Sequence, residues 1–303
     1  MARGFTADDV PDQSGRTILV TGANTGIGFE AAAVLAGRGA RVLLGCRDAS
    51  RAADALSRIQ ARHPDADIVV VPLDQGNLAS VADAAAQIAR EPRLDVLINN
   101  AGIMMPPLQH TTDGFESQLG VNHLGTFALT CQLLGLLDRT PDARVVVTSS
   151  LAHRTGQINL DDLGAEHSYD RQGRYQQSKL ANLLFAFELQ RRLIAAGSGT
   201  AVVACHPGIA ATELGRHFPA ILRAPLMAAA GLLLNTPAQG AWPTLMAATS
   251  PDVGAGGYVG PSRRNEMAGP AVLVATARRA RDEQMMQELW ERSAQMTGIE
   301  PGI

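Results

Sequence analysis

The chain has 303 residues, of which 46% are hydrophobic, enough for a substantial buried core in one large α/β domain or two ordinary ones. Its 26 basic and 29 acidic residues give a formal net charge of -3 and form no basic tract, which argues against a nucleic-acid partner. The N-terminal residues lack the apolar core of a signal peptide, and the longest apolar run, Leu226 to Leu234, is far shorter than a membrane span of about 20 residues. We therefore expect no integral membrane segment.

The cysteines and histidines give no sign of a metal site. Cys46, Cys131 and Cys205 lie far apart without a CxxC pair, and the seven histidines have no zinc-like spacing. Such cysteine usage fits a reducing compartment, so we expect a soluble cytoplasmic protein that uses no metal.

Short aliphatic runs alternate with alanine- and leucine-rich stretches of helical length. The runs predict six buried strands, at residues 17–20, 41–44, 68–71, 96–98, 144–147 and 201–204. The stretches predict helices near residues 27–37, 50–61, 78–90, 114–138 and 174–196. Because right-handed crossovers place such helices on both faces of a parallel sheet, the alternation predicts a doubly wound α/β fold.

The two ends of the chain depart from this alternation. Residues 1–13 form a polar N-terminal arm, and residues 14–303 are expected to form one domain, since no repeat or flexible linker separates two cores. The alternation weakens over residues 209–235. Beyond that segment we expect a helix from Pro237, a short strand Tyr258 to Val259 and an amphipathic helix near 276–296.

A glycine-rich loop, TGANTGIG, follows the first predicted strand and opens the first helix. In this position Gly22 can turn tightly, Gly26 lets the backbone approach a pyrophosphate, and Gly28 permits close packing of helix on strand. The amide end of the helix then faces the anion. A glycine-rich turn without a ligand is the alternative, which this position disfavours. The residues expected to contact a dinucleotide here are Gly22, Asn24, Thr25, Gly26, Ile27 and Gly28.

The spacing Gly-x-x-x-Gly-x-Gly differs from the common Gly-x-Gly-x-x-Gly arrangement and resembles the loop of the short-chain dehydrogenase/reductase family. The resemblance covers roughly residues 14–260. It implies a single-domain Rossmann-type doubly wound parallel sheet of about seven strands, ordered 3-2-1-4-5-6-7 and flanked by helices. It also implies a nicotinamide cofactor.

The end of the second predicted strand, GCRD, bears on the choice of cofactor. An acidic residue there would bind the ribose hydroxyls of NAD and repel the additional phosphate of NADP. Arg47 stands there instead and can hold a phosphate through two hydrogen bonds, with Arg51 as a second candidate. We therefore expect NADP(H) to be preferred and NAD(H) to be possible. Arg47 could also be a solvated loop cation, and Asp48 beside it could cap the next helix.

Two further segments carry residues that the resemblance places at the cofactor. Asp74, in LDQGN, would lie at the adenine ring, although a turn or N-cap aspartate is the alternative. The segment NNAG follows the fourth predicted strand, at the edge where ligands of open α/β sheets bind. Its Asn100, Ala101 and Gly102 would line the cofactor site, while Asn99 would brace the sheet.

Reduction of a carbonyl needs a proton donor and a group that stabilises the alkoxide. A tyrosine can serve if a nearby ammonium lowers its pKa from the unperturbed value of about 10. Tyr175 and Lys179 lie four residues apart, on one face of a helix, in the family's Tyr-x-x-x-Lys form. Tyr169 has Gly173 at the equivalent place and is expected to be an ordinary surface tyrosine.

The resemblance places a catalytic serine at the end of the fifth strand, where Ser149 and Ser150 compete. We favour Ser150, which would hydrogen-bond the substrate oxygen, with Ser149 as a hydroxyl facing the sheet. Tyr175 follows Ser150 by 25 positions, more than in many family members. The intervening segment is similar to the branch that contains NADP-dependent retinol dehydrogenases and WW-domain oxidoreductases, which carries an insertion here.

The same resemblance adds residues from two other motifs. Asn122, in VNHLG, would hold a water that links Lys179 to solvent, although a structural asparagine is the alternative. In HPGIAATEL, Pro207, Gly208 and Ile209 would meet the nicotinamide and Thr212 the phosphates. His206 is expected to be structural.

These motifs predict reversible hydride transfer between a nicotinamide and a small-to-medium lipophilic carbonyl or alcohol compound. Residues 209–235 would form a substrate lid, with a core helix over Ala220 to Leu234 as the alternative. The rival hypotheses are a non-enzymatic NADP(H)-sensing or scaffold protein and a nucleotide-sugar epimerase. LANLLFAF, residues 180–187, is apolar nearly all round, so a homodimer or homotetramer is expected unless the insertion covers it within a monomer.

Overall fold

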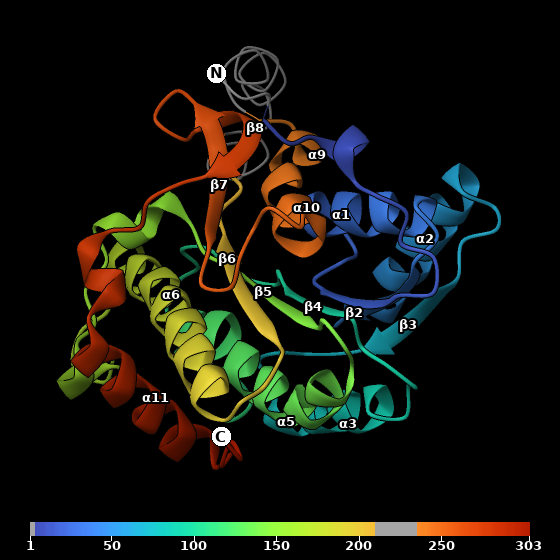
Figure 1. Cartoon of the computed structure of the whole chain (residues 1–303). Coiled ribbons are helices and arrows are strands. Elements are labelled where there is room, and N and C mark those ends of the chain that lie inside the picture. Colours follow the sequence, from blue (N-terminus) through green and yellow to red (C-terminus); the bar gives the residue numbers. More distant parts are fainter. Residues whose placement is uncertain (1–3, 210–234) are drawn as a thin grey trace, which may run out of the picture.

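Eight strands form one sheet at the centre of the computed structural model, which describes residues 4–209 and 235–303 (Figure 1). Their order across the sheet is β3-β2-β1-β4-β5-β6-β7-β8. The strands are β1 (Thr17–Thr21), β2 (Arg41–Cys46), β3 (Ile68–Pro72), β4 (Val96–Asn99), β5 (Arg144–Thr148), β6 (Ala201–Cys205), β7 (Tyr258–Arg263) and β8 (Ala268–Leu273). The predicted doubly wound order of the first seven strands is confirmed, and all of their pairings are parallel.

The eighth strand is an addition to the prediction. It pairs antiparallel with β7, so the two form a hairpin at one edge of the sheet. Gly260, Pro261, Gly269 and Pro270 interrupt the strand signal in the sequence, and such residues are tolerated mainly at edges and bulges. The N-terminal arm covers part of this edge, since Phe5 exchanges two backbone hydrogen bonds of 2.8 Å with Ala271.

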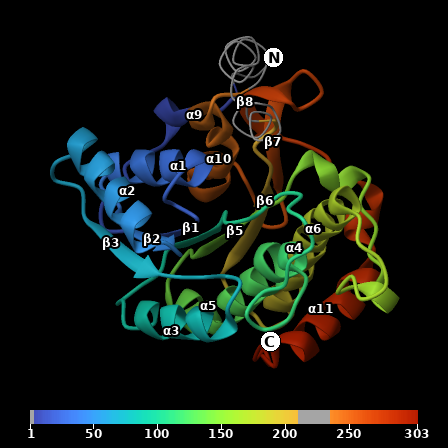
Figure 2. The same cartoon turned by 180° about the vertical axis from the view of Figure 1, so that it is seen from behind.

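Helices cover both faces of the sheet (Figures 1 and 2). One face carries α1 (Gly26–Gly37), α2 (Ala49–Arg62), α9 (Pro237–Gly240) and α10 (Trp242–Thr249). The other carries α3 (Leu78–Ile88), α5 (Gly125–Arg139) and α6 (Arg171–Ala195). Along β1, Ile18 and Val20 join the apolar core on the first face, and Leu19 joins the core on the second. A central strand such as β1 is apolar at successive positions because both of its faces are buried.

The predicted helix over residues 114–138 is divided in the structure. It comprises α4 (Ser117–Leu119), a π-helical segment η2 (Gly120–Leu124) and α5. Single π-helical turns often occur at functional sites, because the wider turn displaces a side chain from regular helical register. Asn122 lies on this segment.

The last helix, α11 (Glu283–Thr297), packs on the outer side of α6 (Figure 1). Trp290 stacks on Phe185 at 5.9 Å between ring centroids, and the Arg281 guanidinium lies 4.0 Å from the centroid of the Phe187 ring. The 3-10 helices of the insertion, η3 (Leu151–Arg154) and η4 (Leu160–Asp162), lie toward the start of α6, where Arg174 forms a buried ion pair with Asp162. The chain itself thus covers the apolar face of α6 for which we considered a partner subunit.

Candidate active site

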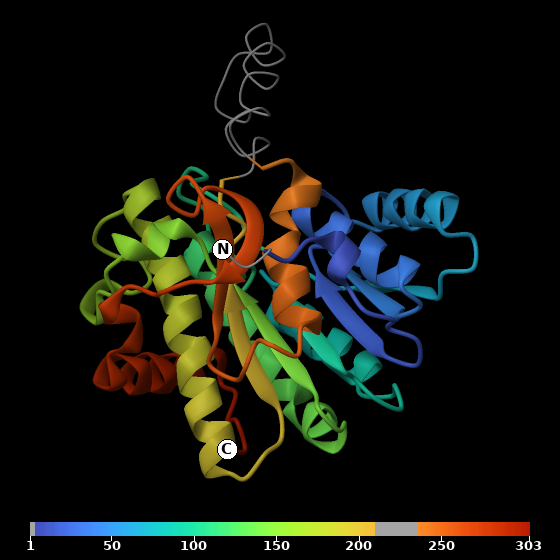
Figure 3. The ribbon, with the colours of Figure 1, turned by 45° about the horizontal axis from the view of Figure 1, so that its top comes forward.

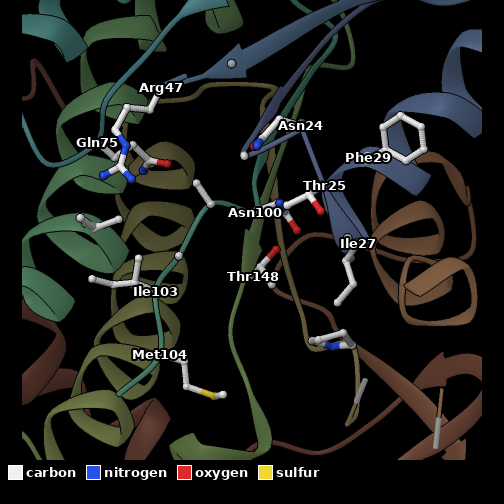
Figure 4. A pocket seen from close by; sticks show the side chains of 18 of the residues that line it. Asn24, Thr25, Ile27, Phe29, Arg47, Gln75, Asn100, Ile103, Met104 and Thr148 are labelled. Atoms are coloured by element: carbon white, nitrogen blue, oxygen red, sulfur yellow. The ribbon is translucent and has the colours of Figure 1, made fainter. Parts of the chain in front are cut away.

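A cavity of about 700 Å³ opens at the carboxyl ends of the parallel strands. In Figure 4, Arg47 lies in the upper part of the view and Met104 in the lower part, with Asn100 and Thr148 between them. The volume is in the range of small-molecule and cofactor sites. The predicted site residues that line it are Gly22, Asn24, Thr25, Gly26, Ile27, Gly28, Arg47, Asp74, Asn100, Ala101, Gly102, Ser150, Tyr175, Lys179, Pro207 and Gly208.

Three of the predicted site residues are not among those that line the cavity. Asn122 is fully buried, and Ile209 follows the lining residue Gly208. Thr212 lies outside the described residues, as does the predicted lid apart from its ends at 209 and 235.

The glycine loop passes from β1 to α1 with little space to spare. Gly22 has a φ of +66°, and a Cβ at Gly28 would lie 2.6 Å from the Gly22 carbonyl oxygen and 2.4 Å from Asn100 Nδ2. By contrast, a Cβ at Gly26 would meet nothing within 4 Å. The loop therefore packs tightly on its protein side and is open at Gly26, a shape that fits a pyrophosphate at the amide end of α1.

The segment after β4 is fastened to the end of β1 by Thr21. The Thr21 Oγ1 accepts hydrogen bonds from the backbone amides of Asn100 (3.0 Å) and Ala101 (2.9 Å), and Asn100 Nδ2 donates to the Thr21 carbonyl (2.8 Å). Asn99 Nδ2 instead donates to Thr130 Oγ1 on α5, at 2.9 Å. Asn99 thus braces the sheet as expected. Thr21 directly precedes Gly22 but was not predicted as a site residue.

Arg47 lies exposed at the end of β2 and lines the cavity. Asp48 beside it caps α2, because its carboxylate accepts the backbone N–H of Arg51 at 3.0 Å. That hydrogen bond lowers the pKa of Asp48. Arg51 also lines the cavity, but its side chain is 73% exposed and its Nε lies 3.8 Å from the Asp48 carboxylate. A phosphate bound at this end of the cavity would therefore contact Arg47, while the Asp48 carboxylate is held by its hydrogen bond to the start of α2.

Asp74 is a turn aspartate that also lines the cavity. Its Oδ1 accepts the Gly76 N–H at 2.9 Å. The neighbouring Gln75 is a lining residue that the sequence analysis missed. Its Nε2 donates to Thr126 Oγ1 at 3.0 Å, which ties the turn after β3 to α5.

Tyr175 and Lys179 are nearly buried on α6 and face the cavity together. Lys179 Nζ lies 5.7 Å from the centroid of the Tyr175 ring. Tyr169 has a different environment, since its hydroxyl donates to the Pro106 carbonyl at 2.8 Å and accepts from Gln118 Nε2 at 3.3 Å. The second tyrosine is therefore the one that shares the cavity with a lysine, whereas Tyr169 holds the segment after β4.

The two serines at the end of β5 are distinguished by their hydrogen bonds. Ser149 is buried, and its hydroxyl donates to the Lys179 carbonyl at 2.7 Å, so it fastens α6 to the sheet. Ser150 is half-buried, and its Oγ accepts the Ala152 N–H at 3.2 Å as the cap of η3. That arrangement leaves the Ser150 hydroxyl hydrogen able to point toward the cavity.

Asn122 connects the segment after β4 with α6. Its side chain accepts the Ile103 N–H at 2.7 Å and donates to the Ile103 carbonyl at 3.0 Å and to Ser178 Oγ at 2.9 Å. A Cβ at Gly102 would lie 3.2 Å from both Asn122 Oδ1 and Lys179 Nζ, so the two groups converge on that glycine. Ile103 and Ser178 were not predicted, because nothing in the local sequence reveals contacts between segments so far apart in the chain.

Three apolar residues that were not predicted also line the cavity: Ile103, Met104 and Val121, the last of which lies near Gly76 in the turn after β3. Within residues 4–209 and 235–303, no group of three or more His, Cys, Asp or Glu side chains could hold a metal ion. In the same ranges, no helix is long and apolar enough to cross a membrane.

Comparisons with known proteins agree on one family. A family model described as short chain dehydrogenase matches residues 16–220. Retinol dehydrogenase 14 of Mus musculus is 42% identical over 300 residues, covering 94% of this chain and 86% of the relative, and human retinol dehydrogenase 13 is 40% identical over 297 residues, with the same coverage.

Two solved structures are also similar to this chain. The crystal structure of an uncharacterized protein from Mycobacterium paratuberculosis has a TM-score of 0.80 and 41% identity, and the match covers 99% of this chain and 100% of that one. The complex of Pseudomonas aeruginosa RhlG with NADP at its active site has a TM-score of 0.59 and 26% identity, with coverage of 82% and 93%.

Proposed function

Because the chain belongs to the short-chain dehydrogenase/reductase family, in its retinol dehydrogenase-like branch, and is thus a NAD(P)-dependent dehydrogenase acting on CH–OH groups, we propose that it interconverts a lipophilic carbonyl compound and its alcohol with NADP(H). The observation that carries the proposal is the convergence of Tyr175, Lys179 and Ser150 on one cavity with the glycine loop and Arg47. When bound, the nicotinamide supplies or accepts the hydride.

Each polar residue has a task that its surroundings allow. Tyr175 gives a proton to the substrate oxygen during reduction and takes it back during oxidation. The Lys179 ammonium favours the phenolate of Tyr175 and holds the nicotinamide ribose. Ser150 donates a hydrogen bond to the same oxygen. Asn122, which is fixed by Ile103 and Ser178, holds a water beside Lys179 and so completes a route for the proton to solvent.

The rest of the cavity would bind the dinucleotide. The loop from Gly22 to Gly28 takes the pyrophosphate, with Thr212 as a further phosphate contact, and Asp74 lies by the adenine. Asn100, Ala101 and Gly102 form one side of the cofactor site, while Pro207, Gly208 and Ile209 meet the nicotinamide. The preference for NADP(H) rests on Arg47, whose guanidinium offers two parallel donors to a phosphate while Asp48 is engaged in the α2 cap.

The substrate class rests on Ile103 and Met104, apolar side chains that line the cavity and would contact an apolar molecule bound there. The names of the relatives, retinol dehydrogenases 13 and 14, accord with a lipophilic alcohol or aldehyde. The reducing cytoplasm is the proposed compartment, because Cys46, Cys131 and Cys205 are all free and buried.

A Tyr175→Phe variant tests the catalytic assignment. The rate of NADPH oxidation, measured with a panel of lipophilic aldehydes, ketones and quinones, should fall about 1000-fold. The reason is that the substitution removes the proton donor and keeps the ring. NADPH affinity, measured by fluorescence titration, should stay within about threefold, since the phenyl ring preserves the packing. A Tyr169→Phe variant is the matched control and should keep most of the turnover. Near-normal turnover in Tyr175→Phe would exclude this assignment.

A further inference from the structure

The turn of the β7–β8 hairpin reaches the loop that follows β6. Arg264, Asn265 and Glu266 in this turn have φ values of +54°, +53° and +65°, a left-handed conformation that is costly for three consecutive non-glycine residues. Met267 accepts the backbone N–H of Ile209 at 3.0 Å. The strained turn is thus attached to the segment that we assign to the nicotinamide.

His206 links this turn to Gly208. The Gly208 N–H donates to His206 Nδ1 at 3.2 Å, so in a neutral imidazole the proton lies on Nε2, which donates to Glu266 Oε2 at 3.1 Å. Burial lowers the pKa of His206, which favours this neutral form. The fit is tight, because a Cβ at Gly260 would lie 2.1 Å from Nε2.

The other oxygen of Glu266 contacts the segment that follows β5, the strand that pairs with β6. Arg154 Nη2 donates to Glu266 Oε1 at 2.7 Å, and Arg154 ends η3, the short helix that Ser150 caps. Next to Arg154, the fully buried His153 accepts the Ala277 N–H on Nε2 at 3.3 Å, so its Nδ1 carries the proton and donates to the Ser150 carbonyl at 2.6 Å. The Tyr258 ring contacts both histidines, with centroids 5.5 Å and 5.3 Å away.

We propose that Glu266 is a positioning residue, which holds the Ser150 side of the cavity through Arg154 and the Gly208 side through His206, and so fixes the spacing of these two walls. The proposal rests on the proposed function, in which Ser150 meets the substrate oxygen and Gly208 meets the nicotinamide. Hydride transfer depends on the spacing of the two reactants, and an error of 1 Å can cost about 100-fold in rate. A carboxylate suits the task, because it has two oxygens and accepts one donor from each wall.

Two substitutions of His206 separate the two halves of its link. His206→Asn keeps an acceptor near the position of Nδ1 and loses the donor to Glu266, whereas His206→Gln keeps a donor near Nε2 and loses the acceptor for Gly208. Since the proposal requires both hydrogen bonds, each variant should lower kcat about tenfold. A His206→Asn variant with the wild-type kcat would overturn the proposal, because Gly208 would then be held without Glu266.

Glu266→Gln tests the carboxylate directly. It keeps the length of the side chain but presents an amide to Arg154, so kcat should fall about tenfold while the Kd for NADPH changes less than about threefold. Arg154→Gln should have the same effect, and the double variant should be no worse than either single one, since both remove one link. Arg263→Gln is the control. It removes an exposed cation from the same hairpin and should leave kcat unchanged. If the losses of kcat in the double variant were additive, Arg154 and Glu266 would act independently, which would contradict the proposal.

Hydrogen exchange provides a readout that needs no turnover. In the full chain, with and without NADPH, Glu266→Gln should speed amide exchange both at 206–209 and at 151–155, while Arg263→Gln should speed neither. If the wild type reduces no carbonyl compound, the proposed function fails and this measurement still tests the positioning role. Faster exchange confined to the hairpin itself would overturn the positioning role while leaving the proposed function intact.

Discussion

The two sides of the cavity are built from contacts of different range. On the nucleotide side, Gly22, Gly28, Asp48 and Asp74 act on backbone a few residues away or on the adjoining loop. On the C-terminal side, Arg154 and Glu266 are 112 residues apart in the chain, and His206 and Glu266 are 60 apart. Figure 3 shows the hairpin of β7 and β8 beside α10, against which it packs. In this chain the turns and the helix cap on the nucleotide side thus depend on contacts within a few residues, even though Thr21 also binds the distant Asn100. The support of the C-terminal side comes from segments far apart in the chain.

A pair of glycine variants gives the largest effect and tests whether the two sides are separable. In Gly28→Ala, the new methyl group would overlap the Gly22 carbonyl oxygen and Asn100 Nδ2, so the loop must move and NADPH affinity should fall more than about 100-fold. In Gly260→Ala, the methyl group would displace the His206 ring, so kcat should fall about tenfold while NADPH affinity is kept.

Fluorescence titration with NADPH and steady-state rates measure the two effects. Gly199→Ala is the matched control, because a Cβ there would meet nothing within 4 Å. If Gly260→Ala loses NADPH binding to the same extent as Gly28→Ala, the two sides act as one unit and the comparison fails.

A second prediction concerns acid and the docking of the C-terminal helix. His123 is fully buried on η2, and its Nε2 lies 2.8 Å from Ser293 Oγ on α11. Burial lowers the pKa of His123 from 6.5 to about 4. As the pH falls below 6.5, His123 becomes protonated in the unfolded chain while it stays neutral in the folded chain, which lowers the free energy of unfolding. The stabilisation that a neutral His123 gives is therefore complete above pH 6.5 and is lost by pH 4. The shift corresponds to about 3 kcal/mol of unfolding free energy.

Urea unfolding at several pH values between 7 and 4 measures this loss. His123→Gln keeps a donor for Ser293 without a titrating ring, so its stability should fall less over this range than that of the wild type. His153 and His206, whose pKa values burial also lowers, are present in both proteins and cancel in the difference. Parallel pH curves for the two proteins would contradict a neutral His123 in the folded chain.

How far the sequence predicts the molecule follows from the range of each contact. The strands and the lining residues from Gly22 to Gly28 were predictable, because each signal lies within one strand-loop-helix unit. The order of the strands was implied by the family resemblance and not by any local signal. The Tyr175–Lys179 pair was predictable for the same reason, since both residues lie on one face of α6. Asp48 was also foreseen as a possible helix cap, and its hydrogen bond from the Arg51 N–H confirms that role.

What escaped prediction depends on tertiary contacts or on weak local signals. Strand β8 contains a glycine and a proline, so no apolar run marks it, and only pairing with β7 and Phe5 makes it a strand. The structural role of His206 was expected, but its partner was not, because Glu266 lies in a polar turn with no local signal that it contacts a buried histidine. The packing of α11 on α6 could not be predicted, because no local signal shows that the end of the chain returns to that face of the helix.

Substitutions of Arg47 and Arg51 should have smaller effects on NADPH affinity than Gly28→Ala, and they test the nucleotide side alone. Arg47→Gln should lower NADPH affinity about 10- to 100-fold and NADH affinity less than about twofold, because only NADPH carries the phosphate that the guanidinium would hold. The difference should shrink at high salt, since Arg47 is exposed. Fluorescence titrations with both cofactors at two salt concentrations measure it.

Arg51→Gln is the finer test of the same side. Its side chain is 73% exposed and lies 3.8 Å from the Asp48 carboxylate, so its charge is partly balanced and screened, and NADPH affinity should fall only about two- to threefold. The Asp48 cap should persist, because its donor is the backbone N–H of Arg51 and not the side chain. Equal losses in Arg47→Gln and Arg51→Gln would mean that a diffuse positive rim, and not a single guanidinium at the end of β2, selects the cofactor.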